Sequence, residues 1–295
     1  MTMQLLKSVL QGPTLVTYPQ RITSGSSTLV AYALRRDHKL ILFLERTPFH
    51  PVDSRWPDQP SDRGTLSFNQ KKLEVIDCRI LALKGQDLIE NKECKERDLP
   101  RLIGHVVEYS DGLQKEIDDY LGQEIEVEVE EEYRNKISLH HTACHLAALA
   151  LNMVMNGLWK KQPTFLDSFN NGDFDKLAIQ QSFIREAEAE DFYRFNSKIK
   201  KYFNRDEFTA NASEVQKKVN KILEEWIQSG SIVSIETQDQ TVMERRIWRC
   251  NLPEGEAKIP CGGTHVSTLS CFEKIEYTIA LSKDGFASTT KAWMK

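Results

Sequence analysis

The chain has 295 residues, an apolar fraction of 40% and a net charge of −4 at pH 7. This length indicates two domains, and the apolar fraction is sufficient to bury a core in each. No apolar run reaches the roughly eighteen residues of a membrane span, and the first residues do not read as a signal peptide. Six scattered cysteines indicate reduced thiols in the cytoplasm, and the acidic balance indicates that any RNA contact is local.

The first hundred or so residues contain short apolar-rich runs bounded by turn residues. We predict strands there at 28–34, 40–44, 64–68, 73–83 and 102–108. Short strands with frequent turns are typical of a small β-barrel. The Asp111-Gly112 turn precedes a change of pattern, so we expect a β-barrel domain at 1–112 and a second domain at 113–295.

Helices and strands are both predicted in the second domain. Residues 124–130 alternate Glu with Ile or Val, which predicts a half-buried strand. The stretch from His140 to Trp159 lacks proline and is rich in Ala, Leu and Met, which predicts a buried helix. The other predicted elements are helices at 187–194 and 212–229 and strands at 231–236, 242–250 and 271–281. The mixture predicts an α+β domain.

Four potential metal ligands fall in two close pairs within this second domain. His141 and His145 are four residues apart, so both project from one face of the predicted helix. Cys261 and His265 enclose a Gly-Gly-Thr turn that is flexible enough to aim both side chains at one point. Either pair alone is weak evidence, but three imidazoles and a thiolate together suit zinc best. The sequence therefore predicts one Zn²⁺ site.

Motifs around these ligands resemble those of a known group of proteins. The run Arg134–Leu146, with the later Cys261–Val266, resembles the editing domain of alanyl-tRNA synthetases and the free-standing AlaX-type editing proteins. The upstream TPFHP at 47–51 and QPSDRGTL at 59–66 resemble a signature that precedes the zinc domain of the longer AlaX proteins. The resemblance covers roughly residues 28–266. It implies an α+β editing domain of the threonyl/alanyl-tRNA synthetase type behind the barrel.

The same resemblance implies an activity. A trans-acting deacylase of this kind binds the acceptor end of a mischarged aminoacyl-tRNA and hydrolyses seryl or glycyl esters of alanine tRNA. Zinc can lower the pKa of a water to about 7 and polarise the ester carbonyl. Discrimination requires a polar group that hydrogen-bonds the serine hydroxyl. Gln59 and Thr47 stand where the family motif places functional positions, so we expect them to act in catalysis.

Two departures from the family pattern leave alternatives open. Pro57-Asp58 replaces two glycines in a loop lengthened around 56–58, and His50 replaces a tyrosine. Proline restricts the backbone, so the loop takes another path, and a deacylase for a different amino acid is one alternative. A non-catalytic, zinc-stabilised tRNA-binding module is the other. A zinc peptidase is disfavoured because the motif around His141 lacks the glutamate base.

Lysine-rich segments are the candidates for RNA contact. The first runs from Lys198 to Arg205 and is followed by Lys217, Lys218 and Lys221, and a comparable second candidate is formed by Arg245, Arg246 and Arg249. Lysines in such a pattern are also typical of a solvated helix face. No pattern in the sequence indicates an oligomeric state.

Overall fold

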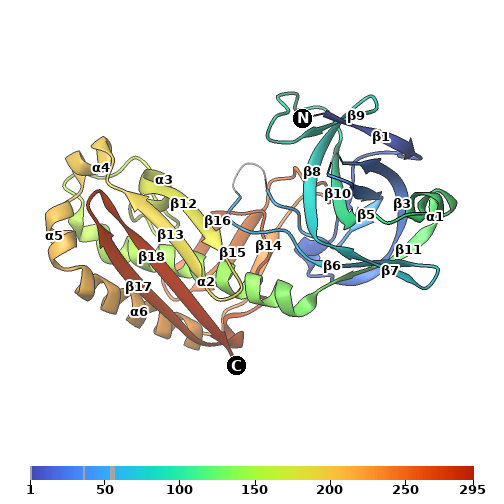
Figure 1. Cartoon of the computed structure of the whole chain (residues 1–295). Helices are drawn as coiled ribbons and strands as arrows, with labels where there is room; N and C mark the ends of the chain where they lie inside the picture. Colours follow the sequence, from blue (N-terminus) through green and yellow to red (C-terminus); the bar gives the residue numbers. More distant parts are fainter. Residues whose placement is uncertain (1, 36, 54–56) are drawn as a thin grey trace. The chain divides into compact units, whose positions relative to one another are not determined.

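The computed structural model describes residues 2–35, 37–53 and 57–295, and the chain folds into two compact units (Figure 1). Unit 1 contains the chain up to Arg134 together with Thr237–Arg245, and unit 2 contains Asn135–Glu236 and Arg246–Lys295. The first unit therefore extends beyond the predicted boundary at residue 112. The reason is that the alternating segment, strand β11 (Glu124–Val129), pairs with strands of unit 1 and buries its apolar residues there.

Unit 1 contains a closed six-stranded β-barrel in the described part of the chain, which confirms the predicted barrel. Neighbouring strands are antiparallel, and pairing of the first strand with the last closes the ring. In order around the barrel, the strands are β1 (Thr2–Ser8), β9 (Asp87–Glu90), β8 (Asp77–Lys84), β10 (Arg101–Glu108), β4 (Lys39–Leu44) and β3 (Ser24–Leu34).

One core cluster of unit 1 takes side chains from all six strands and fills the barrel. Its buried members are Val30, Ala31, Ala33, Ile41, Phe43, Leu81, Leu88, Leu102 and Val106. Gly104 lies on β10, where an added Cβ would be 2.4 Å from Cγ2 of Ile41. A glycine is needed there because any side chain would displace this packing.

Strand β3 continues past the barrel into a second layer of unit 1. Its first half pairs with β11, which pairs in turn with β6 (Gly64–Phe68) and then β7 (Lys71–Val75). Helix α1 (Leu113–Tyr120) buries Leu113 and Ile117 in a second core cluster of unit 1, separate from the cluster that fills the barrel. The short strands β2 (Leu15–Val16) and β5 (Arg46–Thr47) pair in parallel, and the segment that returns from unit 2 adds Val242 to this core.

Unit 2 is a mixed α+β unit with two antiparallel sheets. The four-stranded sheet has the order β12 (Ile179–Ile184), β13 (Ala189–Arg194), β18 (Gly285–Met294) and β17 (Phe272–Ser282). The three-stranded sheet has the order β14 (Val233–Glu236), β15 (Ile247–Leu252) and β16 (Gly255–Pro260). The helices are α2 (Glu131–Met155), α3 (Phe174–Ala178), α4 (Ser197–Tyr202), α5 (Arg205–Ala210) and α6 (Ala212–Gln228).

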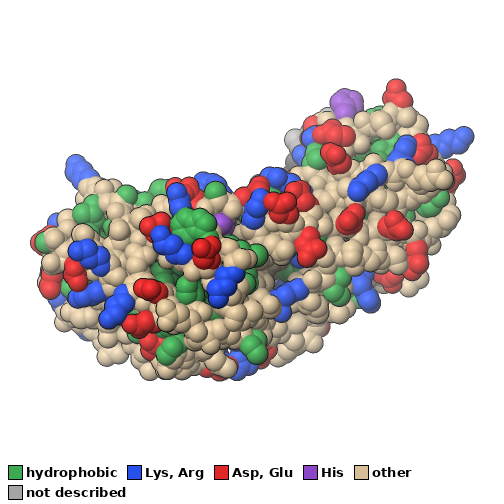
Figure 2. Space-filling view, turned by 90° about the horizontal axis from the view of Figure 1, so that it is seen from below, with side chains coloured by type: hydrophobic (Ala, Val, Ile, Leu, Met, Phe, Trp, Pro, Cys, Tyr) green, Lys and Arg blue, Asp and Glu red, His purple; other side chains and the backbone are tan. Residues whose placement is uncertain are grey.

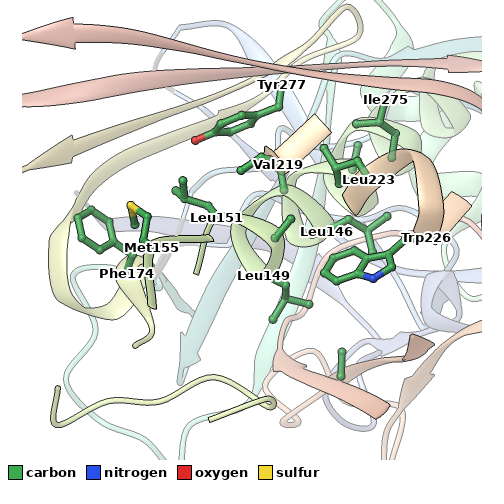
Figure 3. Close-up of a cluster of buried hydrophobic side chains, with 14 of the residues drawn as sticks. Leu146, Leu149, Leu151, Met155, Phe174, Val219, Leu223, Trp226, Ile275 and Tyr277 are labelled. Carbon is green, nitrogen blue, oxygen red and sulfur yellow. The ribbon is translucent and has the colours of Figure 1, made fainter. Parts of the chain in front are cut away.

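The core of unit 2 forms where two long helices meet the larger sheet. Figure 3 shows Leu146 and Leu151 of α2, Leu223 and Trp226 of α6, and Tyr277 of β17 in this cluster. Helix α2 supplies buried residues along most of its length, as its continuous apolar composition predicts. In the described residues, no helix combines the length and the apolar character needed to cross a membrane.

The predicted helix at 187–194 is wrong, because most of this segment is strand β13. Ala189, Asp191 and Tyr193 are buried, and the residues between them are more exposed, which is the period of a strand. The strand pairs on both sides, with β12 and β18. These pairings override the helical propensity of its Ala and Glu residues.

Asp191 is buried on this strand, and Asp175 of helix α3 is half-buried beside it. Asp191 accepts a hydrogen bond from Cys144 Sγ at 3.3 Å, and Asp175 accepts one from the Tyr193 hydroxyl at 2.7 Å. Burial, with repulsion from Asp191, raises the pKa of Asp175 to about 7. Folding therefore favours the protonated form of Asp175.

This raised pKa predicts that the protein loses stability as the pH rises. Between about pH 4 and 7 the folded chain binds more protons than the unfolded chain, so the free energy of unfolding falls across that window. Asp175→Asn is expected to raise the unfolding temperature at pH 8 and to change it little at about pH 4.5. Circular dichroism melts at the two pH values measure this, and equal shifts at both would contradict the assignment.

Candidate metal centre

Four side chains from two separate parts of unit 2 converge on one point, as the sequence predicts. His141, His145, Cys261 and His265 each offer one ligand atom, and these atoms all lie within 4.8 Å of one another. His141 and His265 are buried, whereas His145 and Cys261 are half-buried. The group could hold a metal ion.

Helix α2 and the loop after β16 position these four residues. His141 and His145 are one turn apart on α2, with ring centroids separated by 4.8 Å. The loop is tied to β15 because Cys261 N–H donates to the Arg246 carbonyl at 3.0 Å. Cys261 Sγ then lies 3.4 Å from His141 Nε2 and 3.3 Å from His265 Nε2.

A backbone amide also points at the sulfur. Gly263 N–H donates to Cys261 Sγ at 3.4 Å. A donor at this position favours the negatively charged sulfur that a metal requires. The Gly-Gly-Thr turn therefore contributes a hydrogen bond as well as flexibility.

Thr142 fixes the orientation of His265. Its hydroxyl donates to the Ser138 carbonyl at 2.9 Å, one helical turn back. The same oxygen lies 3.2 Å from His265 Nδ1 and accepts from Val266 N–H at 3.2 Å. Because the hydroxyl proton is already donated, His265 Nδ1 must carry the hydrogen. The lone pair of His265 is then on Nε2, the atom beside Cys261.

The role of Thr142 was not predicted, because its partners lie in a loop more than a hundred residues away. We expect Thr142→Val to weaken metal binding by about 10- to 100-fold, since the imidazole loses its acceptor. Ser138→Ala is the matched control, because it keeps the carbonyl that Thr142 uses and removes only the bond from Ser138 Oγ to Thr264. Competition with a chromophoric chelator measures both affinities. Equal affinities in the two variants would contradict this role.

His145 has the features of a metal ligand. Its Nε2 is buried and has no hydrogen-bond partner in the described part of the chain. Burial lowers the pKa of His145 to about 4, so the ring is neutral at physiological pH. A buried imidazole nitrogen without a partner is costly, and a neutral imidazole is the form that binds metals. Trp248 packs against the ring, with centroids 5.3 Å apart.

Two other side chains in or next to the HTACH segment (His141–His145) are held elsewhere. His140 Nδ1 lies 2.9 Å from the Lys136 carbonyl oxygen, and His140 Nε2 accepts from Ala292 N–H at 3.3 Å. Cys144 donates to Asp191. Both side chains therefore contribute to the packing of unit 2 and are not in the metal group.

The two residues expected to act in catalysis lie in unit 1. Thr47 is fully buried, and its hydroxyl oxygen is 2.7 Å from His105 Nε2 and accepts from Phe49 N–H at 3.1 Å. His105 Nδ1 lies 3.0 Å from the Leu42 carbonyl oxygen and donates to it, so Thr47 donates its proton to Nε2. Burial lowers the pKa of His105 to about 4, in keeping with a neutral ring.

Gln59 is also buried. Its Nε2 lies 3.4 Å from His50 Nδ1, and its backbone N–H donates to Asp58 Oδ1 at 2.8 Å. Pro57 and Asp58 form the turn before it, and Trp56, also in the predicted insertion, lies outside the described residues. Burial lowers the pKa of His50 to about 4. The structure thus brings Gln59 together with His50, which replaces the family tyrosine.

A buried ion pair closes the loop that carries Gln59. Arg134 Nε donates to Asp62 Oδ1 at 2.7 Å, and Arg134 Nη2 contacts Asp62 Oδ2 and donates to the Pro48 carbonyl at 2.7 Å. Asp62 also accepts from His50 N–H. Both halves of the pair belong to motifs that carry the resemblance to editing proteins, yet nothing in the sequence indicates that they meet.

A scan of the chain against known protein families finds no family that matches. The functional interpretation therefore depends on the motifs and on the geometry of the site.

Proposed function

We propose that the chain is a trans-acting aminoacyl-tRNA deacylase that binds Zn²⁺ through His141, His145, Cys261 and His265. The observation that carries the proposal is the convergence of two motifs, HTACH and CGGTH, on one point in unit 2. Their resemblance to alanyl-tRNA editing proteins favours seryl or glycyl esters of alanine tRNA as substrates. The ester would be presented by the acceptor end of the tRNA.

The donor set fits zinc in both chemistry and spacing. Zinc is held by imidazole and thiolate ligands, and a tetrahedral ion with usual bond lengths places sulfur and nitrogen about 3.6 Å apart. Cys261 Sγ lies 3.4 Å from His141 Nε2 and 3.3 Å from His265 Nε2, close to that separation. The buried, unpartnered Nε2 of His145 supplies a further donor.

The proposed chemistry is hydrolysis of an activated ester. When bound, zinc supplies a Lewis acid for the ester carbonyl. The chain's own residues hold that ion and must distinguish serine from alanine through its hydroxyl. Gln59 and Thr47 are the two residues proposed for this task. A site built to hydrogen-bond a hydroxyl discriminates strongly against a substrate that lacks it.

A second candidate function is a zinc-stabilised tRNA-binding module without catalysis. It is favoured by the fact that four protein ligands converge, since four ligands complete a tetrahedral site and are typical of structural zinc. A deacylase for another amino acid is the remaining candidate, favoured by Pro57 and Asp58 in the loop before Gln59.

One panel of substrates separates these candidates. Purified protein is mixed with alanine tRNA charged with serine, glycine or alanine, and with a set of other aminoacyl-tRNAs. The proposed function predicts that serine or glycine is released from the tRNA and that alanine is not. Release of a different amino acid would favour the deacylase for another amino acid. Binding of tRNA without hydrolysis of any ester would favour the tRNA-binding module over the enzyme.

A further inference from the structure

Two lysine pairs that are far apart in the sequence lie side by side in unit 2. Lys160 and Lys161 follow α2, and Lys200 and Lys201 are in the last turn of α4. Lys160 N–H donates to the Tyr202 carbonyl at 2.7 Å, and a bridge between Trp159 and Phe203 aligns the two segments. This backbone pairing fixes the spacing of the four lysines.

The side chain of Tyr202 lies between members of both pairs. Lys161 Nζ is 5.5 Å and Lys201 Nζ is 5.2 Å from the centroid of the Tyr202 ring. Tyr202 is half-buried, and all four lysines are exposed. We call Lys160, Lys161, Lys200, Lys201 and Tyr202 the lysine–tyrosine surface.

The ring and its lysines rest on a rigid base. Phe203, the next residue, is buried and packs edge-on against Trp159, with ring centroids 5.0 Å apart. The lysine–tyrosine surface is therefore preorganised and does not depend on a mobile loop.

The other lysine-rich helix, α6, is the comparison for this surface. On α6, exposed Lys217, Lys218 and Lys221 are interspersed with acidic residues, and Lys221 pairs with Glu225 at 3.9 Å. Figure 2 shows positive and negative side chains mixed over the face that carries α6. In the described part of the chain, the lysines of the lysine–tyrosine surface make one salt bridge, from Lys200 to Asp284 at 3.6 Å. The side chain of Lys198, which opens the predicted patch, lies outside the described residues.

We propose that the lysine–tyrosine surface binds the sugar-phosphate backbone of a tRNA near its acceptor end, where Lys161 and Lys201 turn from the Tyr202 ring to phosphates and a base stacks on the ring in their place. Cations that flank an aromatic ring are the features that hold single-stranded nucleic acid, because lysines bind phosphates and every base has a face that stacks. The identity of the RNA rests on the proposed function. The surface itself rests on the geometry above.

The distance from the metal centre suits this occupant. Helix α2 carries His145 and runs on to Met155, about 15 Å along its axis at roughly 1.5 Å per residue, before it reaches Lys160. A strand with its ester at the metal centre would span that length with about four stacked nucleotides at ~3.4 Å each. Helix α2 sets part of the separation between the ester and the phosphates, and the five residues from Asn156 to Lys160 set the rest.

The test compares two double variants with the same change of charge. Lys161→Gln/Lys201→Gln removes the two lysines that flank Tyr202, and Lys217→Gln/Lys221→Gln is the control on α6. Binding of uncharged alanine tRNA is followed by fluorescence anisotropy at several salt concentrations. The first variant is expected to bind about tenfold more weakly, with a slope of log affinity against log salt shallower by about 1.5. The control is expected to keep both values.

A third variant tests the ring. Tyr202→Leu is expected to weaken binding by about tenfold and to leave the salt slope unchanged, because stacking involves no ion release. Zinc content and thermal unfolding, measured for each variant, show that the fold is retained.

Two results would overturn the inference. If the wild-type protein binds tRNA and the flanking-lysine variant has the same affinity and slope, or the α6 control weakens equally, the surface is not the contact and the proposed function stands. If the wild-type protein binds no tRNA, the surface and the proposed function both fail.

Discussion

Replacing Arg134 with methionine is expected to lower the free energy of unfolding by about 3–5 kcal/mol, because Asp62 would remain buried without its counter-ion. The two side chains are 4% and 2% exposed, so water cannot substitute for the lost partner. Methionine preserves most of the apolar volume of the arginine stem. The loss therefore reports the uncompensated charge and not a cavity. Urea unfolding of the two proteins measures the difference.

The half-buried pair of Arg79 with Asp77 provides the control. Its side chains are 41% and 22% exposed, so Arg79→Met should cost less than about 1 kcal/mol. The double variant Arg134→Met/Asp62→Leu should recover part of the loss, because both charges are removed together. Recovery should be incomplete, since the Pro48 carbonyl and His50 N–H also lose partners. Equal losses for Arg134→Met and Arg79→Met would contradict a buried ion pair.

Cys261→Ala is expected to slow hydrolysis of seryl-tRNA by about 100- to 10,000-fold, the range that corresponds to several kcal/mol of lost transition-state stabilisation. Cys261 Sγ lies within 3.4 Å of two imidazole nitrogens, so its removal acts directly on the metal group. Single-turnover hydrolysis of seryl-tRNA measures the chemical step apart from tRNA binding.

Cys271→Ser is the matched control for this variant. Cys271 is half-buried, immediately precedes β17 and is not in the metal group. The Cys271→Ser protein should retain both its metal and its rate of seryl-tRNA hydrolysis. A Cys261→Ala protein that loses metal and keeps its rate would assign the metal to stability alone and favour the binding module.

The convergence of the four candidate metal ligands could be predicted because each pair is local in sequence. A four-residue spacing on a helix places two side chains on one face whatever the rest of the fold does, and the same spacing around Gly-Gly-Thr forms a compact loop. The donor chemistry of the two pairs then indicates that they share an ion. The barrel was predictable for a similar reason, because its strands are short apolar runs separated by turns.

The unpredicted features depend on contacts between distant segments. Thr142 acts through a loop that follows it by more than a hundred residues, and Asp62 meets Arg134 across 72 positions. The strand at Ala189–Arg194 contains helix-forming residues, and pairing on both sides determines its structure. The first unit extends beyond the predicted boundary at residue 112 for the same reason, since β11 pairs with β3 of that unit.

Measurement of the metal in the purified protein tests the central claim most directly. Elemental analysis with X-ray absorption at the zinc edge should find about one zinc per chain, bound by one sulfur and by imidazole nitrogens. His141→Ala/His145→Ala should lose that zinc, because half of the donor set is removed. Full zinc retention in this double variant, or a zinc ion with no sulfur ligand, would contradict a centre built from His141, His145, Cys261 and His265.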